Sequence, residues 1–251
     1  MTELTPTGAV PSPPAEPPAP HLAPHAVPWQ HAIAWFEDAM RLFKWRPVTW
    51  MALALVTVVV DLVCQALPDP WTVLGKFATP LVACGLVYAA AAADRHTTVR
   101  LGFALRAFGL PTGTLLAVLL ASFVTFAAEA ATAWWLADVN LLTSAHDARD
   151  LSVAAVFGVY AIGVLVSLPV TFVPFAALFE RVALRPAFAA SWRAFVLNTP
   201  PLIVYGGISL ALLGLGVATL GLGLLLVLPL WAASSYLAWK DIFGIKEAPE
   251  A

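Results

Sequence analysis

Long apolar runs separated by short charged segments make up most of the chain from residue 48 onward. Spanning about 30 Å of hydrocarbon takes about 20 helical residues, so each apolar run of that length is a candidate membrane span. The run from Pro201 to Trp239 contains no charged residue and is long enough for two spans, so we expect it to fold back at Gly221 and Gly223. The pattern therefore predicts six transmembrane helices, at 48–67, 73–93, 114–135, 152–178, 202–220 and 224–240.

Amphipathic segments with a shared spacing precede the first, third and fifth predicted spans. In each copy an aromatic residue or Leu is followed by a small residue, an Arg, a Phe and finally a proline. On a helix the apolar positions share one face and the arginine lies nearly opposite, which is typical of a helix at a membrane surface. The pattern has two explanations. The three segments are repeats of common descent, or each converged independently on a sequence suited to an elbow helix, a helix that lies on the membrane surface and turns at the proline into the next span. We expect such elbow helices at 32–45, 98–108 and 186–197, with Arg41, Arg106 and Arg193 directed toward lipid head groups.

The composition excludes an ordinary soluble domain. Of the 251 residues, 61% are hydrophobic and 11% are charged, and the mean hydropathy is +0.84. Soluble domains are about 45–50% apolar and about 25% charged. The net charge of -2 provides no basic field for nucleic acid. The expected fold class is therefore all-α, a polytopic membrane protein whose six transmembrane helices form three hairpins, each preceded by an elbow helix.

The basic residues are unequally divided between the two sides that these spans define. Of the 13 Lys and Arg residues, all but Lys76 and Arg149 fall on the side of the two termini. An excess of Lys and Arg marks the cytoplasmic side of a membrane protein. We therefore expect both termini in the cytoplasm, which requires an even number of spans.

The first 28 residues differ in composition from the rest of the chain. They contain nine of the 21 prolines and no Lys or Arg, and they lack the cationic start and apolar stretch of a secretory signal. We expect 1–28 to be a disordered cytoplasmic tail, 29–244 to be a single six-helix membrane domain, and 245–251 to be a short cytoplasmic tail.

Three ionisable side chains fall inside the predicted spans, namely Asp61, Lys76 and Glu129. Because an ionisable group in a bilayer is costly, each is a candidate functional residue. Asp61 and Lys76 lie at similar depth on either side of the short turn at 68–70, so one interpretation is a structural pair that fixes the first hairpin. The alternative is a polar substrate or proton site that opens outward, with Glu129 as its unpaired acid.

Two of the predicted spans have unusual local sequences. The span at 152–178 contains Pro169 and Pro174, each of which removes a backbone hydrogen bond, so we expect it to bend. The span at 202–220 carries a stripe of small residues that permits close helix contact, within the monomer or between two copies. The stripe consists of Gly207, Ala211, Gly214 and Ala218.

Familiar motifs of reaction chemistry are absent from the sequence. It contains no GxxxxGK[ST] phosphate loop, no HExxH, no GxSxG and no CxxC. We therefore expect a protein that is not an enzyme, with no catalytic residues, no cofactor and no metal site. The expected partners are membrane lipids and either a second copy or another membrane protein, but not nucleic acid.

A family resemblance rests on FEDAMRLFKWRPVTW at 36–50, the central elbow, and VLPLWAASSYLAWKDIFG at 227–244. Over residues 29–244 the chain resembles uncharacterised bacterial inner-membrane proteins with six helices. That group is similar to the membrane-spanning domain of some bacterial glycerophosphodiester phosphodiesterases. The resemblance implies the six-helix fold and a location in the bacterial cytoplasmic membrane, and it carries over no catalytic residues.

The functional hypotheses differ in what they require of the protein interior. The first is a protein without enzymatic activity that organises the membrane or assembles with partners, favoured by the three basic elbow helices. The second is a transporter or export component for a small molecule or lipid that uses Asp61 and Glu129. A lipid-active enzyme follows only from the resemblance. A central cavity that reaches Glu129 would favour transport, whereas a solid apolar core would favour the organising role.

Overall fold

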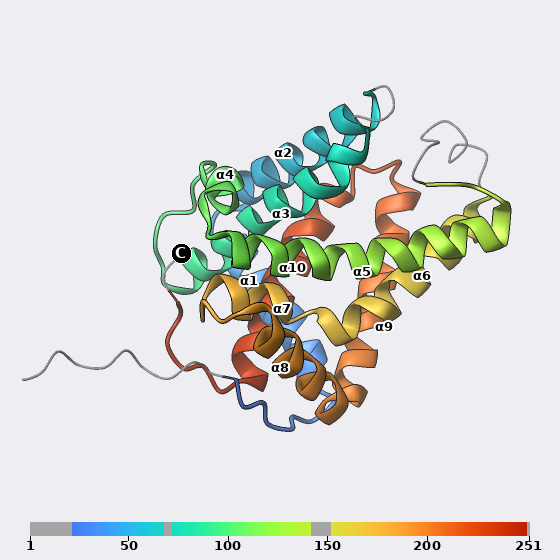
Figure 1. Cartoon of the computed structure of the whole chain (residues 1–251). Helices are drawn as coiled ribbons and strands as arrows, with labels where there is room; N and C mark the ends of the chain where they lie inside the picture. The colour runs from blue at the N-terminus through green and yellow to red at the C-terminus, as the bar shows by residue number, and fades with distance from the viewer. Residues whose placement is uncertain (1–21, 68–71, 142–151, 250–251) are drawn as a thin grey trace, which may run out of the picture.

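The computed structural model describes residues 22–67, 72–141 and 152–249, which consist of helices and their connections (Figure 1). No strand occurs in these described ranges, so the predicted all-α class is confirmed. The helices are α1 (His31–Trp45), α2 (Pro47–Gln65), α3 (Thr72–Asp94), α4 (Phe103–Arg106), η1 (Ala107–Gly109), α5 (Thr112–Ala137), α6 (Val153–Ser167), η3 (Leu168–Val170), α7 (Val173–Leu178), α8 (Leu184–Leu197), α9 (Thr199–Ala218) and α10 (Leu224–Ile242).

Four helices of the described chain are long and apolar enough to cross a membrane. They are Pro47–Gln65, Gly75–Asp94, Thr112–Ala137 and Thr199–Ala218. Large apolar side chains cover the outward faces of α2 and α5, for example Leu55 and Leu62 on α2 and Leu120 and Phe123 on α5. Contiguous apolar surface of this kind is unfavourable in water and favourable against lipid tails. The chain therefore fits an α-helical protein embedded in a membrane.

The region of the fourth predicted span is broken, as its two prolines led us to expect. Helix α6 gives way to the short 3₁₀ helix η3, and α7 begins after a further bend (Figure 1). Ser191 of α8 is fully buried against the break, where its Oγ donates to the Pro169 carbonyl at 2.8 Å and accepts from the Phe172 N–H at 3.1 Å. A side chain from another helix thus satisfies backbone groups that the break leaves without helical partners.

The long uncharged run folds back into two helices at the predicted place. Helix α9 ends at Ala218 and α10 begins at Leu224, and Gly221 adopts a φ of +89°, which suits glycine because it has no Cβ. Thr219 closes the turn, since its Oγ1 accepts from the Gly223 N–H at 2.7 Å. The second half of α10 is less apolar than the other long helices because it carries Ser234, Ser235, Lys240 and Asp241.

The small-residue stripe of α9 lies on an outward face. Helix α9 packs against α6, α1 and α10, and it buries Leu202, Ser209 and Leu213. Gly207 is exposed, and a Cβ added to it would meet no atom within 4 Å; the same holds for a Cβ at Gly214. The interpretation of the stripe as a packing face within the monomer is therefore wrong, because α9 presents its opposite face to the bundle.

Residues 22–28 form a segment without regular secondary structure that lies along the end of the bundle. The His25 N–H donates to the Ile242 carbonyl at 2.9 Å, and the Val27 N–H donates to Asn198 Oδ1 at 2.8 Å. Asn198 is fully buried, and its Nδ2 also donates to the His25 carbonyl at 3.0 Å. Part of the segment 1–28, which the composition assigns to a disordered tail, therefore contacts the helix bundle through His25 and Val27. Residues 1–21 lie outside the described ranges.

A large cluster of buried side chains lies where the C-terminal ends of α3 and α10 meet α1 and α7. The largest fully buried side chains include Trp50, Tyr236 and Trp239. Trp239 stacks on Phe175 and Phe179, with ring centroids 5.7 and 5.3 Å apart. We call this end of the bundle the Asp94 end, after the last residue of α3. Aromatic rings thus pack closely against one another at this end.

Candidate functional site: a cavity within the helix bundle

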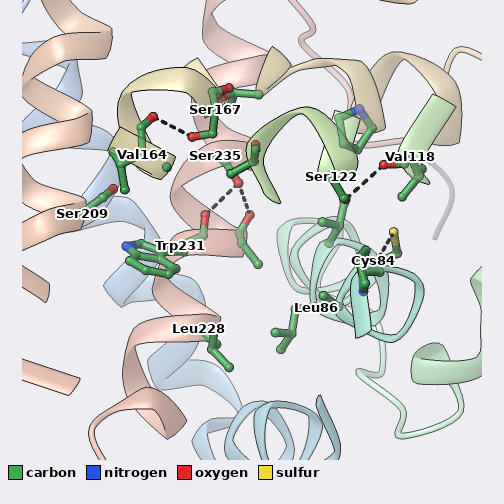
Figure 2. A pocket seen from close by; sticks show the side chains of 18 of the residues that line it. Cys84, Leu86, Val118, Ser122, Val164, Ser167, Ser209, Leu228, Trp231 and Ser235 are labelled. Atoms are coloured by element: carbon green, nitrogen blue, oxygen red, sulfur yellow. Dashed lines mark hydrogen bonds between the residues drawn. The ribbon is translucent and has the colours of Figure 1, made fainter. Parts of the chain in front are cut away.

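A cavity of about 440 Å³ opens between α3, α5, α6, α7, α9 and α10 (Figure 2). This volume lies within the range of about 300–1,000 Å³ that is usual for small-molecule sites. Figure 2 shows Ser209, Trp231 and Leu228 on one side of it and Cys84, Val118 and Ser122 on the other. Along α5 the lining runs from Val118 to Glu129, a rise of about 16 Å at 1.5 Å per residue. The wall is mostly apolar with a few polar groups, as ligand pockets generally are.

Hydroxyl groups distributed around the cavity already donate their protons to the protein. Ser122 Oγ donates to the Val118 carbonyl at 3.0 Å, and Ser167 Oγ donates to the Val164 carbonyl at 2.7 Å (Figure 2). Ser235 Oγ donates in the same way to the Trp231 carbonyl at 2.7 Å. A hydroxyl whose proton is committed to its own helix keeps lone pairs that accept hydrogen bonds. These positions therefore present acceptors to the cavity.

Two buried polar atoms of the lining residues lack hydrogen-bond partners. They are Ser209 Oγ on α9 and Trp231 Nε1 on α10, two of four such side-chain atoms in the described chain. The other two are Nε1 of Trp50 and of Trp239, in the aromatic core. A buried polar group without a partner is uncommon and destabilising, and it calls for an explanation such as a ligand. The cavity therefore has polar groups that a bound molecule would satisfy.

Glu129 lies at the far end of the α5 lining, against a glycine of α6. A Cβ added to Gly163 would come within 2.8 Å of Glu129 Cγ and would overlap its carboxylate, so the absence of a side chain at 163 makes room for the acid. No hydrogen bond or ion pair between described residues involves Glu129. Lys76 is near enough to interact with it electrostatically, without forming an ion pair. Tyr160 lines the cavity beside it and lies within the electrostatic reach of both Glu129 and Asp61.

Asp61 and Lys76 do not form the ion pair that the sequence suggested. The Asp61 carboxylate accepts from Gln65 on its own helix and from Thr79 Oγ1 at 3.2 Å. The Lys76 ammonium instead lies 4.8 Å from the ring centroid of Phe126 on α5. The direct pairing is therefore wrong, because Asp61 faces the turn of α3 that contains Thr79 while Lys76 reaches toward α5. The residues that line the cavity include Glu129 but neither Asp61 nor Lys76. The turn at 68–70 lies outside the described residues.

The three arginines of the repeated pattern lie at the surface. Arg41 pairs with Asp38 of its own helix, and the Arg106 guanidinium lies 4.8 Å from the ring centroid of Tyr88. Arg193 is exposed. The small residues of the pattern, by contrast, pack inward: Ala39 and Ser191 are fully buried and Ala104 is nearly so. No described group of three or more His, Cys, Asp or Glu side chains is arranged to hold a metal ion.

Sequence reasoning missed a set of charged contacts at the Asp94 end. Asp94 Oδ2 accepts from Lys240 Nζ at 2.5 Å and from the Tyr236 hydroxyl at 2.8 Å. Beside it, Asp241 Oδ2 lies 2.7 Å from His31 Nδ1 and accepts from Trp35 Nε1 at 2.9 Å. These contacts join α10 to α3 and to α1. Their partners are distant along the chain, so no local signal in the sequence points to the pairing.

Comparisons with family models, with curated proteins and with solved structures find no match to this chain. The functional argument therefore depends on the residues and the geometry of the cavity.

Proposed function

We propose that the chain is a membrane-embedded binding protein, a transport or export component that takes a small amphiphilic molecule into the cavity between its helices. The observation that supports this is the cavity itself, which is mostly apolar, reaches Glu129, and is lined by Ser209 Oγ and Trp231 Nε1 without partners. A solid core would have favoured a purely organising role. Of the two acids named for transport, Glu129 is the one that lines the cavity, and Asp61 does not.

The membrane arrangement we propose has six spans, three elbow helices and both termini in the cytoplasm of a bacterial cell. It is supported by an order of elements in which one short amphipathic segment precedes two longer apolar segments three times. The distribution of Lys and Arg supports the same orientation, with the Asp94 end on the cytoplasmic side. In this arrangement Glu129 lies in the outer half of the membrane.

A thiol-protection experiment tests the proposed cavity. The chain has two cysteines, of which Cys84 lines the cavity and Cys64 lies on α2 against Gly75. A Cys64→Ser variant in phosphatidylcholine nanodiscs therefore reports on the cavity through its remaining thiol. We expect dodecanol to slow the reaction of Cys84 with methyl methanethiosulfonate saturably, because a bound chain covers the sulfur. The Cys84→Ser variant, in which Cys64 reacts, is the matched control and should show no protection.

A filling variant gives the second arm of this experiment. Ala232 lines the cavity on α10, so Ala232→Phe in the Cys64→Ser background should slow the reaction without ligand and abolish the protection. Equal reaction rates of Cys84 with and without dodecanol, in folded protein, would overturn the proposed function.

A further inference from the structure

The cavity carries a single kind of formal charge. Among the described residues that line it, Glu129 is the only Asp, Glu, Lys or Arg. The geometry points to a ligand with a protonated amine at the end beside Glu129 and Tyr160, and an apolar body directed toward Val118 and Leu228. This inference rests on the proposed function, because it names the chemical class of the molecule that the cavity takes.

The polar groups next to Glu129 match an amine better than an anion or a metal ion. Ser122, Thr125 and Glu129 all line the cavity from α5 at helical spacing, so they share one face of that helix. The hydroxyls of Ser122 and Thr125 donate to the Val118 and Ala121 carbonyls and so offer acceptors. An ammonium group has three donors and no acceptor, which complements a carboxylate and a row of hydroxyl oxygens. An anion would meet acceptors and a negative charge, and the described residues offer no cluster of metal-ligating side chains.

The Glu129 carboxyl group can bind a ligand because no described residue forms a hydrogen bond or an ion pair with it. Lys76 acts on it electrostatically, but its ammonium group lies over the Phe126 ring and does not line the cavity. A carboxylate in an apolar setting gains most from a partner that carries the opposite charge and donates hydrogen bonds to it. Tyr160 adds an aromatic ring to the same end of the wall, and cations bind favourably over such rings.

A series of probes with one tail and three head groups tests this inference. Dodecylamine, dodecanol and dodecanoate are compared by the concentration that halves the reaction rate of Cys84 in the Cys64→Ser protein. Phosphatidylcholine nanodiscs are used because this lipid has no net charge, so the lipid surface gives none of the probes a net electrostatic attraction. We expect dodecylamine to protect at a concentration about tenfold lower than dodecanol, since a charge-assisted hydrogen bond replaces a neutral one. Dodecanoate should protect least.

Two matched variants then assign the preference to one carboxyl group. Glu129→Gln keeps the shape of the side chain and should reduce the advantage of dodecylamine over dodecanol to within about twofold. Asp61→Asn neutralises an acid that does not line the cavity and reaches Tyr160 only electrostatically, so it should retain most of the advantage. The reaction rate of Cys84 without ligand should be the same in both variants as in the parent, which shows that the cavity is intact.

The outcomes separate this inference from the proposed function. If dodecanol and dodecylamine protect at equal concentrations, or if the advantage of dodecylamine remains in Glu129→Gln, the preference for an amine at Glu129 is wrong. The proposed binding function is not affected by either result. Strongest protection by dodecanoate also overturns the preference for an amine. Failure of all three probes to protect Cys84 overturns both the inference and the proposed function.

Discussion

The Asp94 end and the cavity differ in whether their carboxylates have partners within the protein. At the Asp94 end two carboxylates have close partners: Asp94 has Lys240 and Tyr236, and Asp241 has His31 and Trp35. In the cavity the Glu129 carboxylate forms no hydrogen bond or ion pair with described residues. Polar groups that satisfy one another hold helices together, whereas polar groups left without partners are available to a ligand. The difference separates the part of the molecule that maintains the fold from the part that we propose binds.

The largest effect is expected at the buried ion pair. Lys240→Met leaves the mostly buried Asp94 carboxylate without its cation and should lower the free energy of unfolding by about 3 kcal/mol. The double variant Asp94→Asn/Lys240→Met should recover most of this loss, because no uncompensated charge remains. Thermal unfolding in detergent measures both. Glu129→Gln, measured beside them, should change stability by less than about 1 kcal/mol, since it keeps the shape of the side chain and removes no hydrogen bond or ion pair among the described residues. A larger loss for Glu129→Gln than for Lys240→Met would remove the contrast between the two regions.

Substitutions of two glycines should give the second-largest difference in stability. Gly163→Ala places a Cβ against the Glu129 carboxylate and should destabilise the protein by about 1–3 kcal/mol while weakening protection of Cys84 by dodecylamine. Gly207→Ala is the control, because a Cβ there meets no atom within 4 Å; it should stabilise α9 slightly, by about 0.5 kcal/mol. Equal effects of the two substitutions on stability and on protection would mean that Glu129 does not lie against α6.

Two serines give the smallest effects and the closest comparison. Ser191 Oγ makes two hydrogen bonds across the break between η3 and α7, so Ser191→Ala should cost about 1–2 kcal/mol. Ser209 Oγ lies close to the Tyr205 side chain but makes no hydrogen bond of good geometry, so Ser209→Ala should change stability by no more than about 0.5 kcal/mol. Both serines are buried, so burial alone would predict similar losses of stability. Similar measured losses would show that the two hydroxyl groups contribute equally, whether or not they form hydrogen bonds.

Local features of the chain could be predicted from the sequence because they depend on neighbouring residues. Pro169 and Pro174 have no N–H to donate, and two such residues five positions apart favour a break in the helix around them. A single proline is tolerated elsewhere, since Pro80 and Pro229 lie inside continuous helices. The run from Pro201 to Trp239 was too long for one span, and Gly221 and Gly223 were the residues able to turn it. The amphipathic segments expected at 32–45 and 186–197 coincide with α1 and α8, whereas the one expected at 98–108 is helical only over 103–109, in α4 and η1.

Which face of each apolar helix points inward was decided only by the tertiary structure. A helix such as α9 is apolar on all sides, so its sequence pattern carries almost no information about its rotation, and its small-residue stripe turned out to face away from the bundle. The same holds for the acids. Asp61 and Glu129 look alike in the sequence, yet only Glu129 lines the cavity, because α5 borders the cavity and α2 contributes no residue to its lining. Long-range partners such as Asp94 and Lys240 meet only once the helices have packed, since their contact depends on the positions of whole helices and on no local pattern.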